Sequence, residues 1–492
     1  MSAAVPVRAT GSKRPLFLVH DGAGSVEYAY LLAPHLDPDV PVYALPAPSR
    51  DAPLRTVEGM AARLTRMVRE ARPAGPYRLA GASFGGLLAC EVAVQLIGQD
   101  QTVEFVGIID DRLPGEDAHP LREYIPQLLP VPVHLFPGQG STEPGPGRGW
   151  HALLPGNATR VTPVPGTEAG DLGALGEAVS REIGRAAVSP QPLLEEGYSP
   201  LVTLRFGRSG GVPLFCVPGA GASVAAFTEL AGCLDPSRPV HAFQPRGLDG
   251  DMVPHSTVPA VAELYLRSVR EAQPSGSVHL LGHSFGGWVA FEMARRLRES
   301  GRSVGSLTIL DSEVPDEDGA RVGEYDAGEA FLELVQVFEL TAERSLEIAP
   351  GDVESLDEPG RLRLLHGRLV RLGLMSWRSS PEVLRGPFRT FSACLRAAYR
   401  PTGVYPDRLL LVLVGDDRYD EDKNCTRFVE TVRGWTRWAP GLAFSVGVGN
   451  HMTVLKKPHV QSLASMLTLD PASAPGLAAP PCGAAGSEAR PW

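Results

Sequence analysis

The residue of this chain best suited to nucleophilic chemistry is Ser284. It lies in the segment 282–287, which reads GHSFGG, after an apolar run at 278–281 and before a stretch of helical periodicity at 285–300. A G-x-S-x-G pattern between a predicted strand and a predicted helix places the serine on a sharp turn, because the glycines let the backbone crowd there and expose the hydroxyl. The pattern therefore predicts a nucleophile rather than a serine that only caps a helix.

A serine hydroxyl needs a base to remove its proton and a carboxylate to orient that base. His451 lies in a loop between the last predicted strand and the last predicted helix, whereas the other histidines of this half of the chain lie in predicted strands or helices, beside the serine or upstream of it. Asp311 ends a predicted strand and is the favoured acid; Asp416 and Asp417, after the next strand, are the alternatives. The order serine, aspartate, histidine is typical of α/β-hydrolases.

The same pattern occurs a second time, earlier in the chain. Residues 77–86 read YRLAGASFGG and repeat the predicted strand, the serine and the start of the helix. Asp110 follows Ser83 by 27 positions, the same spacing that separates Asp311 from Ser284. A repeat of this length predicts two homologous domains rather than an array of short units.

The first copy lacks a base. The segment that corresponds to the histidine loop is Val164–Glu168, and no histidine occurs between residues 152 and 240. His151 lies upstream of the expected position, and His20 lies beside a glycine-rich loop, so each is a weak substitute. Because a serine without a base stays protonated, Ser83 and Asp110 are expected to form a degenerate site.

Strands and helices alternate in both halves, which is typical of α/β domains with a mostly parallel sheet between helices. We expect a first domain with a short lid at 1–187, a linker at 188–211, a second domain at 212–470 and a disordered tail at 471–492. A long insertion with helical patterns, about 313–405, is expected to form a lid over the carboxyl ends of the second sheet.

Composition and charge exclude several classes of partner. The 492-residue chain has a formal net charge of −10, which argues against nucleic acid as the main partner. No apolar run is long enough to span a bilayer, and the N-terminus lacks the apolar centre of a signal peptide, so neither a membrane partner nor secretion is expected. The six cysteines form no CxxC pair; we expect them to be reduced in a cytoplasmic protein, with no metal site.

These motifs together resemble a known family. GHSFGG at 282–287, LDS at 310–312 and GNHM at 449–452 are similar to motifs of the thioesterase domains that release products from nonribosomal peptide and polyketide synthases. The resemblance covers nearly all of residues 200–470, and the first domain resembles the same family over about 14–187.

The resemblance implies release of an acyl or peptidyl chain from the phosphopantetheine thioester of a carrier protein, by hydrolysis or cyclisation. It implies Ser284 as nucleophile, His451 as base, Asp311 as acid, and the backbone N–H groups of Phe285 and Ala220 as the oxyanion hole. No phosphopantetheine attachment motif is present, so a carrier protein or synthase module is the expected partner, and no cofactor of the chain's own is expected. The alternatives are an editing thioesterase for misprimed carriers, a general carboxylesterase and, for the first domain, a non-catalytic docking module.

Overall fold

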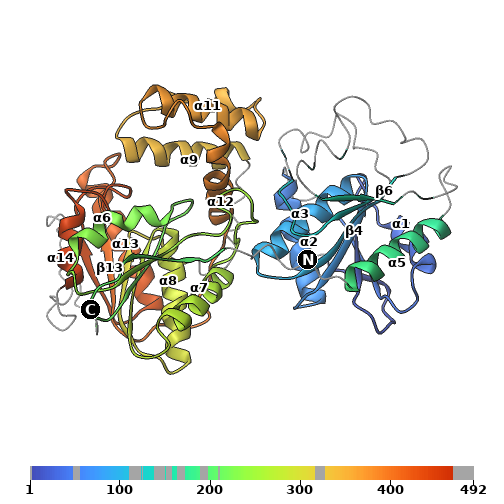
Figure 1. The fold of residues 1–492 in the computed structure, drawn as a ribbon, viewed down its shortest axis with the longest axis horizontal. Coiled ribbons are helices and arrows are strands. Elements are labelled where there is room, and N and C mark those ends of the chain that lie inside the picture. The colour runs from blue at the N-terminus through green and yellow to red at the C-terminus, as the bar shows by residue number, and fades with distance from the viewer. Residues whose placement is uncertain are drawn as a thin grey trace.

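The computed structural model describes residues 3–47, 56–109, 124, 126–137, 150, 154, 158–162, 164, 172–188, 198–208, 211–315 and 327–468. Within these ranges the chain forms two seven-stranded sheets, each with helices packed against it (Figure 1). One edge strand of each sheet is antiparallel to its neighbour, and the other strand pairs are parallel. The expected fold class, two tandem α/β domains with mostly parallel sheets, is confirmed.

The first sheet has the strand order β1-β3-β2-β4-β5-β6-β7. Its strands are β1 Val5–Arg8, β2 Leu16–Val19, β3 Val42–Leu45, β4 Tyr77–Ala82, β5 Val103–Ile109, β6 Val133–Phe136 and β7 Thr159–Val161. The helices around it are α1 Glu27–Leu32, the short 3-10 helix η1 Ala33–His35, α2 Val57–Ala71, α3 Phe84–Gly98 and α5 Leu172–Val188.

The second sheet repeats this plan, with the strand order β14-β13-β12-β11-β9-β10-β8. Its strands are β8 Leu201–Arg205, β9 Leu214–Val217, β10 Val240–Phe243, β11 Val278–His283, β12 Val304–Leu310, β13 Leu409–Leu413 and β14 Leu442–Val446. The helices packed around this sheet are η3 Val224–Phe227, α6 Thr228–Cys233, α7 Val258–Ala272, α8 Phe285–Glu299, α13 Glu421–Trp438 and α14 Val460–Thr468.

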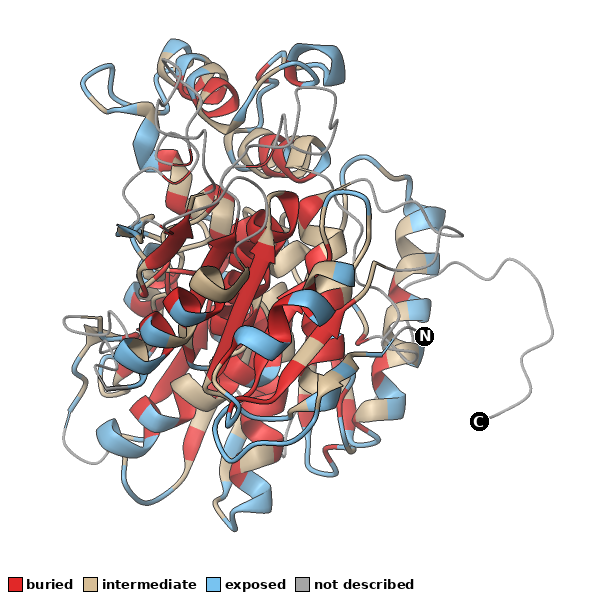
Figure 2. Cartoon of the chain, turned by 90° about the vertical axis from the view of Figure 1, so that its right-hand side faces the viewer, coloured by how far each residue is buried: buried red, intermediate tan, exposed pale blue. Residues whose placement is uncertain are grey.

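The interior strands are buried because helices cover both faces of each sheet. Strands β2 and β9 read LFLV and LFCV, and all their residues are buried, as expected for parallel strands that contact helices on both sides. Figure 2 shows buried strands at the centre and helices with exposed outer surfaces. Amphipathic helices supply that cover: α2, for example, buries its apolar stripe and begins at Thr56, whose side chain accepts a hydrogen bond from the N–H of Gly59.

A group of helices lies between β12 and β13, at one end of the second domain (Figure 1). They are α9 Ala327–Ala342, α10 Pro350–Val353, α11 Glu358–Arg371, the 3-10 helix η4 Pro381–Leu384 and α12 Arg385–Leu395. These helices share an apolar core of their own, in which Phe331 of α9 packs against Phe388 of α12. They lie within the range 313–405, for which the sequence predicts a lid.

Two expectations need correction. The sequence predicts a linker at 188–211, yet β8 lies inside it and pairs with β10, so the second sheet begins at Leu201. An edge strand is half-exposed and lacks the continuous apolar run that marks an interior strand. The sequence predicts reduced cysteines, yet Cys425 is disulfide-bonded. The spacing of cysteines along a chain does not show which of them can meet in the fold. The expected tail at 471–492 lies outside the described residues.

No helix among the described residues is both long enough and apolar enough to cross a membrane.

Candidate active site

Ser284 occupies a strained turn between β11 and α8. Its φ of 54° and ψ of −126° are unusual for a residue other than glycine. The turn is crowded: a Cβ atom on Gly282 would collide with the carbonyl of Gly286. The N–H of Ser284 donates to the carbonyl of Leu310, at 2.9 Å, which fixes the turn to the neighbouring strand β12. The backbone thus holds the serine at the carboxyl end of the sheet.

Asp311 and His451 come together although 140 residues separate them. Asp311 directly follows β12, and His451 lies in the loop between β14 and α14. The Nδ1 atom of His451 donates to Oδ2 of Asp311 at 2.7 Å. This contact leaves Nε2 of the imidazole as the ring atom available to exchange a proton with a substrate or a nucleophile.

The carboxylate of Asp311 is buried but ionised. Burial by itself raises its pKa, but the hydrogen bond and charge of His451, together with the nearby Arg427, outweigh burial and hold the pKa below its usual value. The other carboxylate oxygen, Oδ1, accepts a hydrogen bond from the N–H of Val414 at 3.3 Å and lies 3.5 Å from Nη1 of Arg427. Asp311 is therefore equipped to stabilise a cationic imidazole.

The two alternative acids have other contacts. Asp416 pairs with the guanidinium of Arg418, at 2.7 Å, and Arg418 lowers the pKa of Asp416. Asp417 accepts a hydrogen bond from the side chain of Asn450, at 3.3 Å. Both lie near the histidine loop, but the carboxylate that contacts His451 is that of Asp311.

The expected oxyanion donors lie on either side of the elbow. Phe285 is the first residue of α8, directly after Ser284. Ala220 lies in the loop after β9, and a Cβ atom on its neighbour Gly219 would be only 3.1 Å from the Cβ atom of Ser284. The loop after β9 therefore runs directly against the serine.

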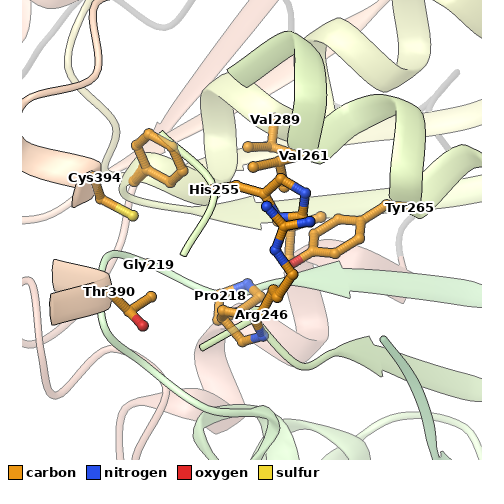
Figure 3. Close-up of a pocket in the computed structure, with 12 residues that line it drawn as sticks. Pro218, Gly219, Arg246, His255, Val261, Tyr265, Val289, Thr390 and Cys394 are labelled. Carbon is orange, nitrogen blue, oxygen red and sulfur yellow. The ribbon is translucent and has the colours of Figure 1, made fainter. Parts of the chain in front are cut away.

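A small pocket lies beside this turn (Figure 3). It is lined by Val217, Pro218, Gly219, Pro245, Arg246, His255, Val261, Tyr265, Phe285, Val289, Thr390 and Cys394. Figure 3 shows Arg246, His255 and Tyr265 gathered on one side of the pocket, with Thr390 and Cys394 of α12 on the other. The pocket thus lies between the sheet and the helical insertion.

The polar groups of the pocket are mostly neutral. Burial, with the charges of Arg246 and Arg267, holds the pKa of His255 well below its usual value. Burial raises the pKa of the Cys394 thiol to about 12. Among the described residues, no cluster of histidine, cysteine and carboxylate side chains could hold a metal ion. The lining of the pocket is mostly apolar and includes a few hydrogen-bonding groups.

A known family model matches most of the chain. The profile of the thioesterase domain matches residues 14–143 and 212–469, which is well over half of the chain. The chain belongs to the thioesterase domain family. Both copies of the sequence repeat lie within the match, so the first domain is a thioesterase domain by descent.

Relatives of this chain include peptide and small-molecule synthases. It is 29% identical over 212 residues to the nonribosomal peptide synthetase btyA of Aspergillus terreus, which is 42% of this chain and 22% of that protein. It is 33% identical over 156 residues to the microperfuranone synthase of Emericella nidulans, which is 31% of this chain and 16% of that protein. The matched segments therefore cover less than a quarter of the length of these relatives. Among solved structures, the Vlm2 thioesterase domain aligns with 55% of this chain and 97% of its own length, at 22% identity and a TM-score of 0.40.

The first thioesterase domain keeps the turn of the second. Ser83 has φ 51° and ψ −115°, and its N–H donates to the carbonyl of Ile109 at 2.9 Å, as Ser284 does to Leu310. His20 is buried at the end of β2, where its Nδ1 donates to the carbonyl of Asp21 and burial lowers its pKa. Asp110 and His151 lie outside the described residues.

No structural role for His283 is predicted from the sequence. Its Nε2 donates to the backbone carbonyl of His451 at 2.9 Å, and the two rings lie 4.7 Å apart. Burial, together with the adjacent His451, lowers the pKa of His283 to about 3, so its ring stays neutral and holds the histidine loop in place. The first copy has Ala82 at this position. That difference, directly before the two serines, is the sequence signal that could have identified His283.

Proposed function

We propose that the second domain is a serine thioesterase that releases an acyl or peptidyl chain from the phosphopantetheine arm of a carrier protein. The observation that carries the proposal is the contact between His451 and Asp311 at the same sheet edge as the strained turn of Ser284. The family of the chain and the synthases among its relatives support a role in secondary-metabolite biosynthesis.

The first half of the reaction transfers the acyl group to the enzyme. His451 accepts the proton of the Ser284 hydroxyl at Nε2 while its Nδ1–H stays on Asp311, and the serine oxygen attacks the thioester carbonyl. The N–H groups of Phe285 and Ala220 stabilise the oxyanion. When the tetrahedral intermediate collapses, the carbon–sulfur bond breaks, and the imidazolium returns its proton to the departing pantetheine thiolate.

The second half resolves the acyl-enzyme. His451 takes a proton from water, or from an amine or hydroxyl of the substrate itself, and that oxygen or nitrogen attacks the ester of Ser284. The serine then leaves with the proton that His451 returns. Water gives a free acid, and an internal nucleophile gives a ring. The pocket beside Phe285, whose lining is mostly apolar, is the place where the acyl chain would lie.

The first domain, in this proposal, is a non-catalytic partner of the second. Its serine turn is intact, but the segment that corresponds to the histidine loop carries no histidine. Position 82 is alanine, so the residue that holds that loop in the second copy is missing as well. A serine in such a turn remains a protonated alcohol and a poor nucleophile at neutral pH.

The test compares Ser284→Ala with Ser83→Ala. We expect Ser284→Ala to lower the turnover of an octanoyl thioester by about 10⁴-fold, since it removes the nucleophile, and Ser83→Ala to leave it unchanged. Intact-mass analysis after a fluorophosphonate should find a single adduct, on Ser284. An adduct on Ser83 in the Ser284→Ala chain, formed at the parent rate, would contradict the assignment of the active copy.

Substrate preference separates this function from its alternatives. A carrier-dependent thioesterase should favour acyl thioesters over the matching oxygen esters, whereas a general carboxylesterase should not. An editing enzyme should prefer short acyl groups on the carrier, and a releasing enzyme should prefer the full-length chain.

A further inference from the structure

The helices that follow the two elbow serines differ at their ends. Helices α3 and α8 each have 15 residues and begin directly after Ser83 and Ser284. The last turns of α8 carry four charged residues, Arg295, Arg296, Arg298 and Glu299. The corresponding residues of α3 are Val94, Gln95, Ile97 and Gly98, of which Val94, Ile97 and Gly98 are buried. The end of α3 is thus suited to contact protein rather than water.

The end of α3 packs against the segment 245–256 of the second domain. The carbonyl of Gly98 accepts a hydrogen bond from the N–H of Ser256 at 2.9 Å. Val253 is buried in the apolar core of the first domain. A Cβ atom on Gly98 would lie 2.6 Å from Oγ of Ser256 and 3.0 Å from the carbonyl oxygen of Pro254. Only glycine at position 98 therefore permits this close approach.

Opposite charges accompany this contact. Asp100, just past the end of α3, lies 3.7 Å from Arg246 and 3.6 Å from Arg267 of the second domain. At a second point, Glu58 of α2 lies 3.2 Å from Arg396, directly after α12. Both carboxylates belong to the first domain and all three arginines to the second. Apart from Arg246, which is buried, these groups are partly exposed. Partly exposed ion pairs add little affinity but fix the orientation of the two surfaces.

The same segment forms one wall of the substrate pocket. Arg246 and His255 line the pocket, and both are more than nine-tenths buried. Arg246 donates through Nη2 to the carbonyl of Ile97, at the end of α3, and through Nε to the carbonyl of Val253, each at 2.8 Å. The guanidinium therefore connects the first domain to the inner wall of the pocket. Across the pocket, Cys394 lies two residues before Arg396.

We propose that the first domain docks through the end of α3 onto the segment 245–256 and thereby positions the Arg246 and His255 wall of the substrate pocket. In this role Arg246 is a positioning residue. The first domain then affects the binding of acyl chains that are long enough to reach that wall. It has no effect on the chemical steps at Ser284. The effect on turnover rests on the proposed thioesterase function, whereas the docking contact can be measured without any activity.

The experiment inserts a side chain into the docking contact. Gly98→Leu places a leucine where a Cβ atom already lies too close to Ser256, and Gly184→Leu is its matched control, since a Cβ atom on Gly184 of α5 meets no other atom within 4 Å. Asp100→Asn is a milder second variant: Asp100 has φ 59°, which asparagine tolerates well, so folding should be preserved. All variants are made in the full chain.

Two readouts follow. Hydrogen–deuterium exchange at residues 253–257 should be faster in Gly98→Leu and Asp100→Asn but not in Gly184→Leu. In both of the first two variants the carbonyl of Gly98, which accepts a hydrogen bond from the N–H of Ser256, is lost or displaced as acceptor. Gly98→Leu should lower kcat/KM for octanoyl-N-acetylcysteamine by about tenfold, mainly by raising KM. Its kcat/KM for the acetyl thioester, and the rate at which a small fluorophosphonate labels Ser284, should stay within about twofold of the parent values.

The outcomes separate three claims: the docking contact, its role in the pocket and the proposed function. Unchanged exchange at residues 253–257 in both variants would overturn the docking contact. Changed exchange with an unchanged octanoyl to acetyl ratio would overturn the role in the pocket. A parent chain that turns over no thioester, yet shows the exchange difference between Gly98→Leu and Gly184→Leu, would refute the proposed function and leave the docking contact standing.

Discussion

Asp311 combines burial with charge, and this combination matters for its role. A buried carboxylate loses hydration and would ordinarily favour its protonated form. The contacts with His451 and Arg427 reverse this tendency and lower the pKa of Asp311, so the carboxylate is ionised throughout the neutral range. An ionised Asp311 fixes the tautomer of His451 with the proton on Nδ1, which leaves Nε2 free to act as a base.

The acid is tested by substitution with asparagine. Asp311→Asn should lower kcat for an octanoyl thioester by about 10²–10⁴-fold, because an amide can hold the imidazole in the wrong tautomer and cannot stabilise its charge. Asp416→Asn is the matched control, and it should change kcat by less than about threefold, since Asp416 pairs with Arg418. Equal losses in the two variants, measured on chains with unchanged circular dichroism, would show that Asp311 is not the acid.

At the scale of elements, the turn between β11 and α8 depends on glycines as much as on the serine. Gly282 faces the carbonyl of Gly286, and Gly287 faces the side chain of Ser312, which itself donates to the carbonyl of Ser284 at 2.6 Å. The strand, the helix and Ser312, two residues after the end of β12, therefore meet with no space for a methyl group. This crowding maintains the unusual backbone angles of Ser284.

Gly282→Ala tests this crowding. The added methyl group should lower the free energy of unfolding of the second domain by about 2–3 kcal/mol and slow the labelling of Ser284 by a fluorophosphonate at least about tenfold. Gly232→Ala in α6 is the control: a Cβ atom there meets no other atom within 4 Å, so stability should stay the same or rise by up to about 1 kcal/mol. Normal stability and labelling in Gly282→Ala would refute the need for glycine.

At the scale of the whole molecule, the two domains differ in the surroundings of a glutamate at equivalent positions. Glu91 of α3 and Glu292 of α8 occupy equivalent positions, and each accepts a hydrogen bond from a tyrosine, at 2.7 Å and 2.9 Å. Burial favours protonation of Glu292, but its hydrogen bonds to Arg295 and Arg296 outweigh burial and lower its pKa. Glu292 is therefore a charged part of the interior network of the second domain.

Glu91 has no arginine at the equivalent positions, which are Val94 and Gln95. Burial raises the pKa of Glu91 most, and the charge of the neighbouring Glu58 raises it further. The pKa reaches about 7 although hydrogen bonds from Tyr124 and Gln95 lower it. The cation that partly opposes this rise is Arg396, which belongs to the second domain. The ionisation of Glu91 in the first domain thus depends on Arg396 of the second.

This difference predicts a pH dependence of stability. Between pH 4.5 and about 7 the folded chain keeps a proton on Glu91 that the unfolded chain has lost. A rise in pH through this window therefore removes stability, which is greatest below it and lowest above it. Glu91→Gln should flatten that slope, and Glu70→Gln, at an exposed site of α2, should retain it.

Urea denaturation at several pH values, with the first domain followed by pulse proteolysis, measures the effect. The parent chain and Glu70→Gln should lose stability on going from about pH 5 to about pH 8, and Glu91→Gln should be the most stable of the three at the higher pH. The same slope in all three chains would show that Glu91 does not titrate in this range.

Local features of the sequence were sufficient for part of this picture. The alternation of apolar strands and amphipathic helices, the two G-x-S-x-G turns and the spacing of 27 residues to an aspartate are all encoded within short segments, so they predicted two α/β domains and the position of Ser284. Burial on both faces gave the interior strands their continuous apolar runs, and they were easily recognised.

Contacts between distant segments were decided by the tertiary structure alone. From the sequence Asp311 was the favoured acid, with Asp416 and Asp417 as alternatives. The pairing of β12 with β13 and of β13 with β14 brings Asp311 to the ring of His451. The role of His283, the pairing of β8 and the docking of α3 on the segment 245–256 likewise depend on groups far apart in the chain. Such pairings depend on how strands and helices pack in three dimensions, and the periodicity of a single segment carries no information about its partner.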